Sequence, residues 1–159
     1  MRYAIIADIH GNLEALQTVL EDAKAQHPTH YVCLGDIVGY NANPKECLKI
    51  VRDMNIPCVK GNHDEYCSSN EVLEGFNPAA AAAVEWTRQQ LTDDDKTWLR
   101  DLKYSRMVAN FTIVHATLDA PERWGYFLLR ILDHYKSARW RLRSQAPGRS
   151  QSSNLQEER

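Results

Sequence analysis

The segment VKGNHDEY, residues 59–66, decides the fold class because an apolar, strand-like run ends there in three polar side chains. Asn62, His63 and Asp64 follow Gly61 directly, and glycine lets a chain turn tightly. Folding alone rarely requires three hydrogen-bonding side chains in a row at the end of a strand. We therefore expect these residues to belong to a site, and the neighbouring segments indicate where that site lies.

Two strand and helix pairs precede this segment and predict a parallel sheet. Apolar, β-branched runs predict strands over residues 2–8, 29–36 and 56–62. Apolar residues at helical spacing predict helices over 12–26, where Asn12 is the cap, and over 44–55, which Pro44 opens. A βαβαβ order implies parallel strands that are joined by right-handed crossovers.

A helical region and a hairpin come next. Residues 77–91 have strong helix propensity, and Thr92 caps a further helix over 93–102. Three aspartates in the first turn of that helix complement its dipole, so we do not interpret them as a metal cluster. Residues 104–116 predict a β-hairpin that turns at Asn110.

Length, charge and cysteines narrow the function classes. A chain of 159 residues forms one domain with a real core, and no apolar run approaches the ~20 residues of a membrane span. The N-terminal run is interpreted as a strand, so we expect a cytoplasmic protein. The four cysteines show no C-x-x-C pair and predict reduced, buried thiols.

The charge is distributed unevenly along the chain. Residues 127–159 carry seven basic and three acidic side chains, which leaves the first 126 residues with a net charge of −6. An acidic body suits divalent cations, and nucleic acid is not expected as a partner.

Side chains that bind metals follow four of the predicted strands. They are Asp8 and His10, Asp36, Asn62 with His63 and Asp64, and His115. The carboxyl ends of parallel strands form the ligand crevice of such sheets, so we expect these groups to converge. Carboxylates, imidazoles and one amide suit Mn, Fe or Zn, and the set is too rich in nitrogen for calcium. Asp36 is suited to bridge two cations, because each of its oxygens can face one.

Each of these residues taken alone has an ordinary structural explanation. A single Asp after a strand is most often a turn or cap residue, and a single His is most often a core or solvated side chain. The conjunction of all of them at strand ends favours a site. Two cations ~3.5–4 Å apart can clamp the oxygens of a phosphate ester and lower the pKa of a shared water. We predict that Asn62 binds metal, His63 faces the substrate and Asp64 orients His63.

These residues resemble a known family, the calcineurin-like metallophosphoesterases, and within it the small prokaryotic phosphodiesterases and phosphatases. The likeness is carried by DIHGN (Asp8–Asn12), GDIVGY (Gly35–Tyr40), GNHDEY (Gly61–Tyr66) and VHA (Val114–Ala116). It covers about residues 1–126. The implied fold is α/β, an α/β/β/α sandwich that is incomplete here: the N-terminal βαβαβ half plus a hairpin.

The resemblance implies two divalent cations, manganese in preference to iron or zinc, and no other cofactor. One cation would be held by Asp8, His10 and Asp36, and the other by Asp36, Asn62 and His115. His63 would protonate the leaving alkoxide, with Asp64 as its partner. The implied activity is the hydrolysis of phosphomono- or phosphodiester substrates by a metal-bound hydroxide at the dinuclear site.

The family pattern stops after Tyr126. Family members continue into a strand that ends in G-H-x-H, whose histidines complete the two metal sites, and no G-H-x-H occurs in this sequence. Residues 127–144 predict a basic amphipathic helix, and the composition of 145–159 predicts a disordered tail. The helix has three open interpretations: it binds a partner, membrane surface or nucleic acid, it packs on the exposed sheet, or it results from a change of reading frame near residue 126.

Two functions therefore stay open. The first is a phosphoric ester hydrolase, impaired by the missing motif. The second is a truncated or frame-shifted remnant without catalysis, which acts at most as a binding module through its basic helix. An uncovered sheet edge would also favour a homo-oligomer that shields it.

Overall fold

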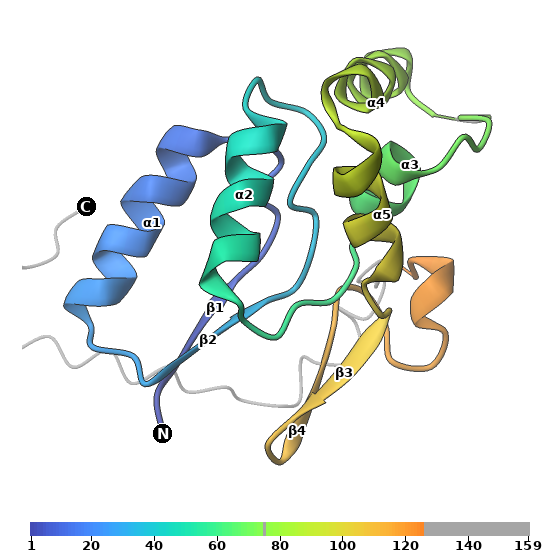
Figure 1. Cartoon of the computed structure of the whole chain (residues 1–159). Helices are drawn as coiled ribbons and strands as arrows, with labels where there is room; N and C mark the ends of the chain where they lie inside the picture. Colours follow the sequence, from blue (N-terminus) through green and yellow to red (C-terminus); the bar gives the residue numbers. More distant parts are fainter. Residues whose placement is uncertain (75, 126–159) are drawn as a thin grey trace, which may run out of the picture. The chain divides into compact units, whose positions relative to one another are not determined.

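The computed structural model describes residues 1–74 and 76–125 (Figure 1). The predicted domain boundary at 126, the basic helix over 127–144 and the tail over 145–159 lie outside the described residues. None of the helices in the described ranges is both long and apolar enough to cross a bilayer.

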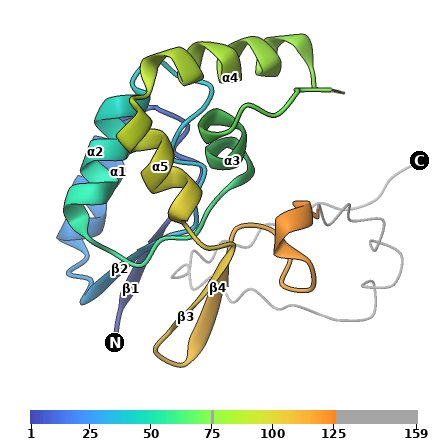
Figure 2. The same cartoon turned by 45° about the vertical axis from the view of Figure 1, so that its right-hand side comes forward.

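The first two strands pair in parallel, as the sequence predicts. Strand β1 (Tyr3–Ile6) runs beside β2 (His30–Cys33). Helix α1 (Leu13–Ala25) connects them, and α2 (Pro44–Met54) follows β2. Asn12 caps α1 by accepting a hydrogen bond from the backbone of Ala15 at 3.0 Å. The two helices lie side by side against one face of the strand pair (Figures 1 and 2).

The predicted third strand over 56–62 is wrong in length. Its pairing consists of two isolated parallel bridges, Cys58 with Cys33 and Val59 with Lys103. The chain then enters a short helix, α3 (Asn62–Ser68), which the sequence analysis does not predict. The three polar residues after Gly61 therefore begin a helix, and this places them at a helix N-terminus beside the end of β2.

The next two helices and the hairpin match the predictions, whereas the short 3₁₀ helix that follows them was not predicted. Helix α4 spans Pro78–Gln90, and α5 spans Asp93–Asp101 behind a capping box made by Thr92. Strands β3 (Ser105–Val108) and β4 (Phe111–Val114) form the antiparallel hairpin, and the 3₁₀ helix η1 covers Pro121–Arg123.

Two hydrophobic clusters hold these elements together. The larger one packs the helices against the face of the strands that carries Ile6 and Cys33. The smaller one joins Val32, Val59 and Ile113 of the hairpin on the opposite face. The hairpin covers that face only in part, because Ile5, which pairs with Val32, remains 59% exposed. The fold is α/β and forms an incomplete sandwich over the described residues.

All four cysteines are free and buried, in agreement with the prediction of reduced thiols.

Candidate metal centre

The predicted site residues converge on one pocket, called here the central pocket, with a volume of about 430 Å³. Its lining comprises Asp8, His10, Asp36, Tyr40, Asn62, His63, His115, Ala116, Thr117, Trp124 and Gly125. The five side chains that the sequence assigns to metal binding are therefore brought together, and His63 joins them. Asp64 is not part of the lining.

The loops that carry these residues adopt a backbone conformation that is unusual outside glycine. Asp8, His10 and Asp36 have φ angles of 52°, 49° and 54°. Such left-handed conformations persist in non-glycine residues only where the surroundings impose them, and they cluster at functional sites. Here the two loops bind each other, because the backbone N–H of His10 donates to the carbonyl of Asp36 at 2.8 Å.

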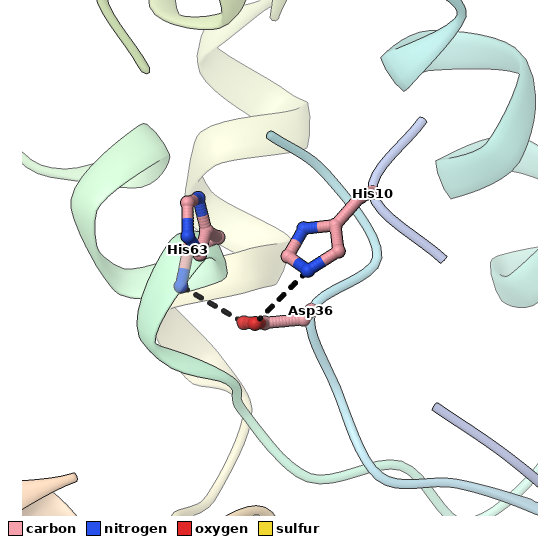
Figure 3. A group of neighbouring side chains, drawn as sticks. All are labelled: His10, Asp36 and His63. Atoms are coloured by element: carbon pink, nitrogen blue, oxygen red, sulfur yellow. Dashed lines mark hydrogen bonds and ion pairs between the residues drawn. The ribbon is translucent and has the colours of Figure 1, made fainter. Parts of the chain in front are cut away.

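Asp36 occupies the centre of the site (Figure 3). Its Oδ2 lies 3.6 Å from Nε2 of His10 and 3.4 Å from Nε2 of His115. Its Oδ1 accepts a hydrogen bond from the backbone N–H of His63 at 2.9 Å. A carboxylate in this position is shared by two sets of nitrogen donors, which is the arrangement expected of a bridging group.

Two groups of potential metal donors share Asp36. One consists of His10, Asp36 and His63, and the other of Asp8, Asp36 and His115. Within each group, the three donor atoms lie within 4.8 Å of one another. The sequence prediction places Asp8 with His10, and Oδ1 of Asp8 lies 3.9 Å from Nε2 of His10. The second donor group shows that Asp8 also lies close to His115.

Backbone carbonyls orient two histidines of the central pocket. Nδ1 of His115 lies 2.8 Å from the carbonyl oxygen of Leu34, and Nδ1 of His10 lies 3.3 Å from that of Val38. A carbonyl only accepts, so each Nδ1 carries the proton and each Nε2 is left to face the pocket. Histidines that bind metals are held in this way by a hydrogen bond from the second ring nitrogen.

Asp36 and His115 shift each other's protonation equilibria. Burial raises the pKa of Asp36, but the hydrogen bond and the charge of His115 outweigh burial and hold the pKa below its usual range. Burial lowers the pKa of His115, yet the hydrogen bond to Asp36 and its charge raise the pKa to about 9. The two side chains therefore form an ion pair in the absence of another cation.

His63 has an unsatisfied buried nitrogen. Its Nδ1 is buried and has no hydrogen-bond partner among the residues that the structure describes. Burial lowers the pKa of His63, and the charge of Asp36 opposes this only in part. Because buried polar groups are nearly always paired in native proteins, an unpaired ring nitrogen here indicates a position that a ligand completes.

Asp64 differs from its predicted role. Its carboxylate accepts hydrogen bonds from the backbone N–H groups of Asp36, Ile37, Val38 and Gly61, at 2.8 to 3.3 Å. These contacts tie the loop after β2 to the start of α3. Burial, followed by the charge of Asp36, raises the pKa of Asp64 to about 7 against the effect of the backbone hydrogen bonds. The prediction that Asp64 orients the ring of His63 is therefore corrected, and Asp64 is a positioning residue for the backbone.

Two aromatic residues of the lining, Tyr40 and Trp124, are not among the predicted site residues. Tyr40 ends the GDIVGY motif, so its place beside Asp36 in the sequence was the available signal. Trp124 follows η1, and no pattern in the sequence connects it with the pocket.

The donor set of the central pocket fits divalent metal ions. The lining combines two carboxylates, three imidazoles and an amide, and none of its members is Lys or Arg. Mixed oxygen and nitrogen donors of this kind suit Mn, Fe or Zn. The carbonyl-oriented histidines and the unpaired nitrogen of His63 support the same conclusion.

Comparisons with known proteins agree with this geometry. The family model described as calcineurin-like phosphoesterase matches residues 1–135. An uncharacterised protein of Methanocaldococcus jannaschii is 38% identical over 138 residues, which cover 82% of this chain and 55% of the relative.

Solved structures give the same result. The crystal structure of a metallophosphoesterase from Sphaerobacter thermophilus matches with a TM-score of 0.65 and 38% identity, over 76% of this chain and 49% of that one. A hypothetical protein of Pyrococcus horikoshii matches with a TM-score of 0.56 over 66% of this chain and 49% of that one. At 23% identity, the second likeness bears on the fold alone. The chain spans about half the length of these relatives.

Proposed function

The chain belongs to the calcineurin-like phosphoesterase family, and from this membership we propose that its central pocket binds two divalent metal ions and hydrolyses phosphate esters. The observation that carries the proposal is the position of Asp36, whose Oδ2 lies within 3.6 Å of ring nitrogens from two different loops. A carboxylate shared by two donor groups can bridge two metal ions, and two ions ~3.5–4 Å apart can clamp the attacking and leaving oxygens of a phosphate ester.

The residues that would hold the metals are Asp36 and four donors around it, while His63, although it belongs to one of the two donor groups, would serve as the acid. Asp8, His10, Asn62 and His115 surround that carboxylate in the lining of the pocket. Manganese is the proposed metal, ahead of iron and zinc, although the donor chemistry accommodates all three. When bound, such ions would neutralise the charge of a phosphate. They would also lower the pKa of a bound water, so that hydroxide is available to attack the phosphate near neutral pH.

The charge of the pocket supports a dependence on metal. A phosphate that enters it meets the carboxylates of Asp8 and Asp36 and no Lys or Arg among the lining residues that the structure describes. In a pocket without metal ions, His115 balances the charge of Asp36 by their ion pair, whereas the carboxylate of Asp8 would still repel the substrate. Phosphate binding is therefore expected to require the metal ions.

His63 is the proposed acid of the reaction. In hydrolysis, a water oxygen forms a new bond to phosphorus while the bond to the leaving oxygen breaks, and the leaving oxygen must gain a proton. The ring of His63 lies at the pocket and within 4.8 Å of the ring of His10, measured between centroids. Burial lowers the pKa of His63, which makes its proton easier to transfer and the protonated ring less populated.

Monoesters and diesters are both proposed as substrates. The alternative function, a binding module without catalysis, depends on the basic helix over 127–144, which lies outside the described residues, and family membership favours the hydrolase.

Turnover tests the proposal. The full chain would be assayed with Mn²⁺ on p-nitrophenyl phosphate and bis(p-nitrophenyl) phosphate. Asp36→Asn and His63→Asn are expected to lower kcat/KM by at least ~100-fold, the usual effect of losing an acid or a ligand. His27→Asn is the matched control, because His27 is exposed and asparagine tolerates its φ of 51°. Activity that survives both pocket variants would refute the assignment.

A further inference from the structure

Two aromatic rings border the central pocket, each beside a different donor group. The ring of Tyr40 lies 4.9 Å from that of His10 and 4.5 Å from that of His63, measured between centroids. The ring of Trp124 lies 6.0 Å from that of His115. The metal donors are therefore flanked by apolar, planar surfaces on the side of each group.

Tyr40 is exposed to solvent although its ring contacts two imidazoles. Its exposed fraction is 51%. An exposed aromatic ring at the border of a polar pocket offers a surface on which another ring can stack. Trp124 also packs against Tyr104, because the centroids of the two rings lie 5.6 Å apart.

The charges of the lining indicate what kind of group would lie on these rings. The pocket has no Lys or Arg among its described lining residues, so a negatively charged leaving group would find no partner beyond the metals. A planar, uncharged ring would meet Tyr40 and Trp124 instead. Small alkyl groups would gain little from either surface.

We propose that the central pocket selects phosphate esters whose leaving group is a planar aromatic ring, that is, aryl esters, and that Tyr40 and Trp124 are its specificity residues. This inference rests on the proposed function and names its substrate class. The alternative is that Tyr40 only positions the rings of His10 and His63. Loss of a positioning residue would weaken every ester alike, whereas loss of a stacking surface weakens aromatic esters selectively.

Calorimetric binding to the full chain in Mn²⁺ separates these possibilities. Phenylphosphonate and ethylphosphonate are compared by affinity, because their P–C bonds are not hydrolysed during the titration and because the better leaving group of an aryl ester would bias a comparison of rates. We expect phenylphosphonate to bind about tenfold more tightly, which corresponds to one aromatic stacking contact. Tyr40→Leu and Trp124→Leu should each move the ratio of affinities toward one, and Tyr40→Phe should keep it.

Trp86→Leu is the matched control, since Trp86 is 40% exposed on α4 and does not line the central pocket. Equal affinity for the two phosphonates, no binding of either, or an equal loss of both in Tyr40→Leu would overturn the inference. Preferential binding of phenylphosphonate, without turnover of phenyl phosphate, would contradict the proposed function and leave the aromatic preference standing. Turnover with equal affinities would contradict the preference alone.

Discussion

Asp36 and Asp64 are both buried carboxylates of the same site, yet their surroundings assign them different tasks. Asp36 faces ring nitrogens at the pocket, whereas Asp64 faces backbone N–H groups behind it. The position of Asp36 at the pocket was predictable from its place after a strand. The role of Asp64 was not, because successive side chains on a helix do not face each other and the helix itself was not expected.

Asp64→Asn is expected to destabilise the fold by about 2–3 kcal/mol, the cost of leaving buried donors unpaired. Asparagine keeps only one of the two oxygens, and its amide nitrogen cannot accept. It would therefore leave unpaired either the N–H groups of Ile37 and Val38, which bind Oδ1, or those of Asp36 and Gly61, which bind Oδ2. Urea unfolding measures the loss, and Asp53→Asn is the control because that side chain is 64% exposed. Unchanged stability with lost turnover would restore the predicted partnership with His63.

Gly39→Ala is expected to disturb the two imidazoles of the site. A Cβ at this position would lie 2.8 Å from Nδ1 of His63 and 3.2 Å from Nδ1 of His10, and the φ of +126° disfavours any side chain. We expect a lower midpoint of thermal unfolding and a Mn²⁺ affinity that falls by at least ~10-fold. A folded variant with wild-type Mn²⁺ affinity would show that the glycine is not needed for the histidine geometry.

At the scale of elements, the helices with long apolar periods and caps were predictable, and the short elements were not. Helix α3 has seven residues, and a helix of that length gains its stability from tertiary contacts. Arg100 of α5 supplies one such contact by donating to the carbonyl of Ser68 at 2.7 Å. The local sequence does not reveal that contact. From the sequence alone, residues 62–68 therefore resemble a loop that follows a strand.

The third strand fails for a different reason. Pro57 has no N–H, so it contributes only its carbonyl, which accepts from Cys33 at 2.9 Å. Pairing is confined to the bridges at Cys58 and Val59. The apolar pattern indicated correctly that this segment is buried in the sheet, but it could not show where regular pairing stops.

The cap of α5 gives a quantitative test at this scale. Thr92 accepts from the backbone N–H of Asp95 at 3.2 Å, and Asp95 accepts from that of Thr92 at 3.0 Å. Thr92→Ala should lower the free energy of unfolding by about 1 kcal/mol. Thr97→Ala on the same helix, at an exposed position, should change it by less than ~0.5 kcal/mol. Equal losses of unfolding free energy in the two variants would mean that the capping box contributes no more to stability than an ordinary exposed side chain.

At the scale of the whole molecule, the family and the convergence of the site follow from the spacing of four short motifs. The extent of the sandwich does not, because the chain spans about half the length of its relatives. Ile5 remains 59% exposed on the face that the hairpin covers in part. A homo-oligomer that covers this region, and a cytoplasmic location, stay predictions.

The burial of the four cysteines predicts that their thiols react slowly in the folded protein. Burial raises the pKa of Cys47 to about 11 and that of Cys67 to about 12. Because the thiolate is the reactive form, these thiols should react slowly with a disulfide reagent at pH 8, and faster as the pH rises. Four thiols should become reactive on unfolding in urea without reductant. Rapid reaction of the native protein, or fewer than four thiols, would contradict the described packing.

The central claim is that Asp36 organises a site for two metal ions, and metal stoichiometry tests it most directly. The purified full chain would be loaded with Mn²⁺, freed of excess, and its bound metal counted by elemental mass spectrometry. We predict two ions per chain in the wild type and in Asp53→Asn, and their loss in Asp36→Asn. No bound metal in the folded wild type, or two ions retained in Asp36→Asn, would contradict the account.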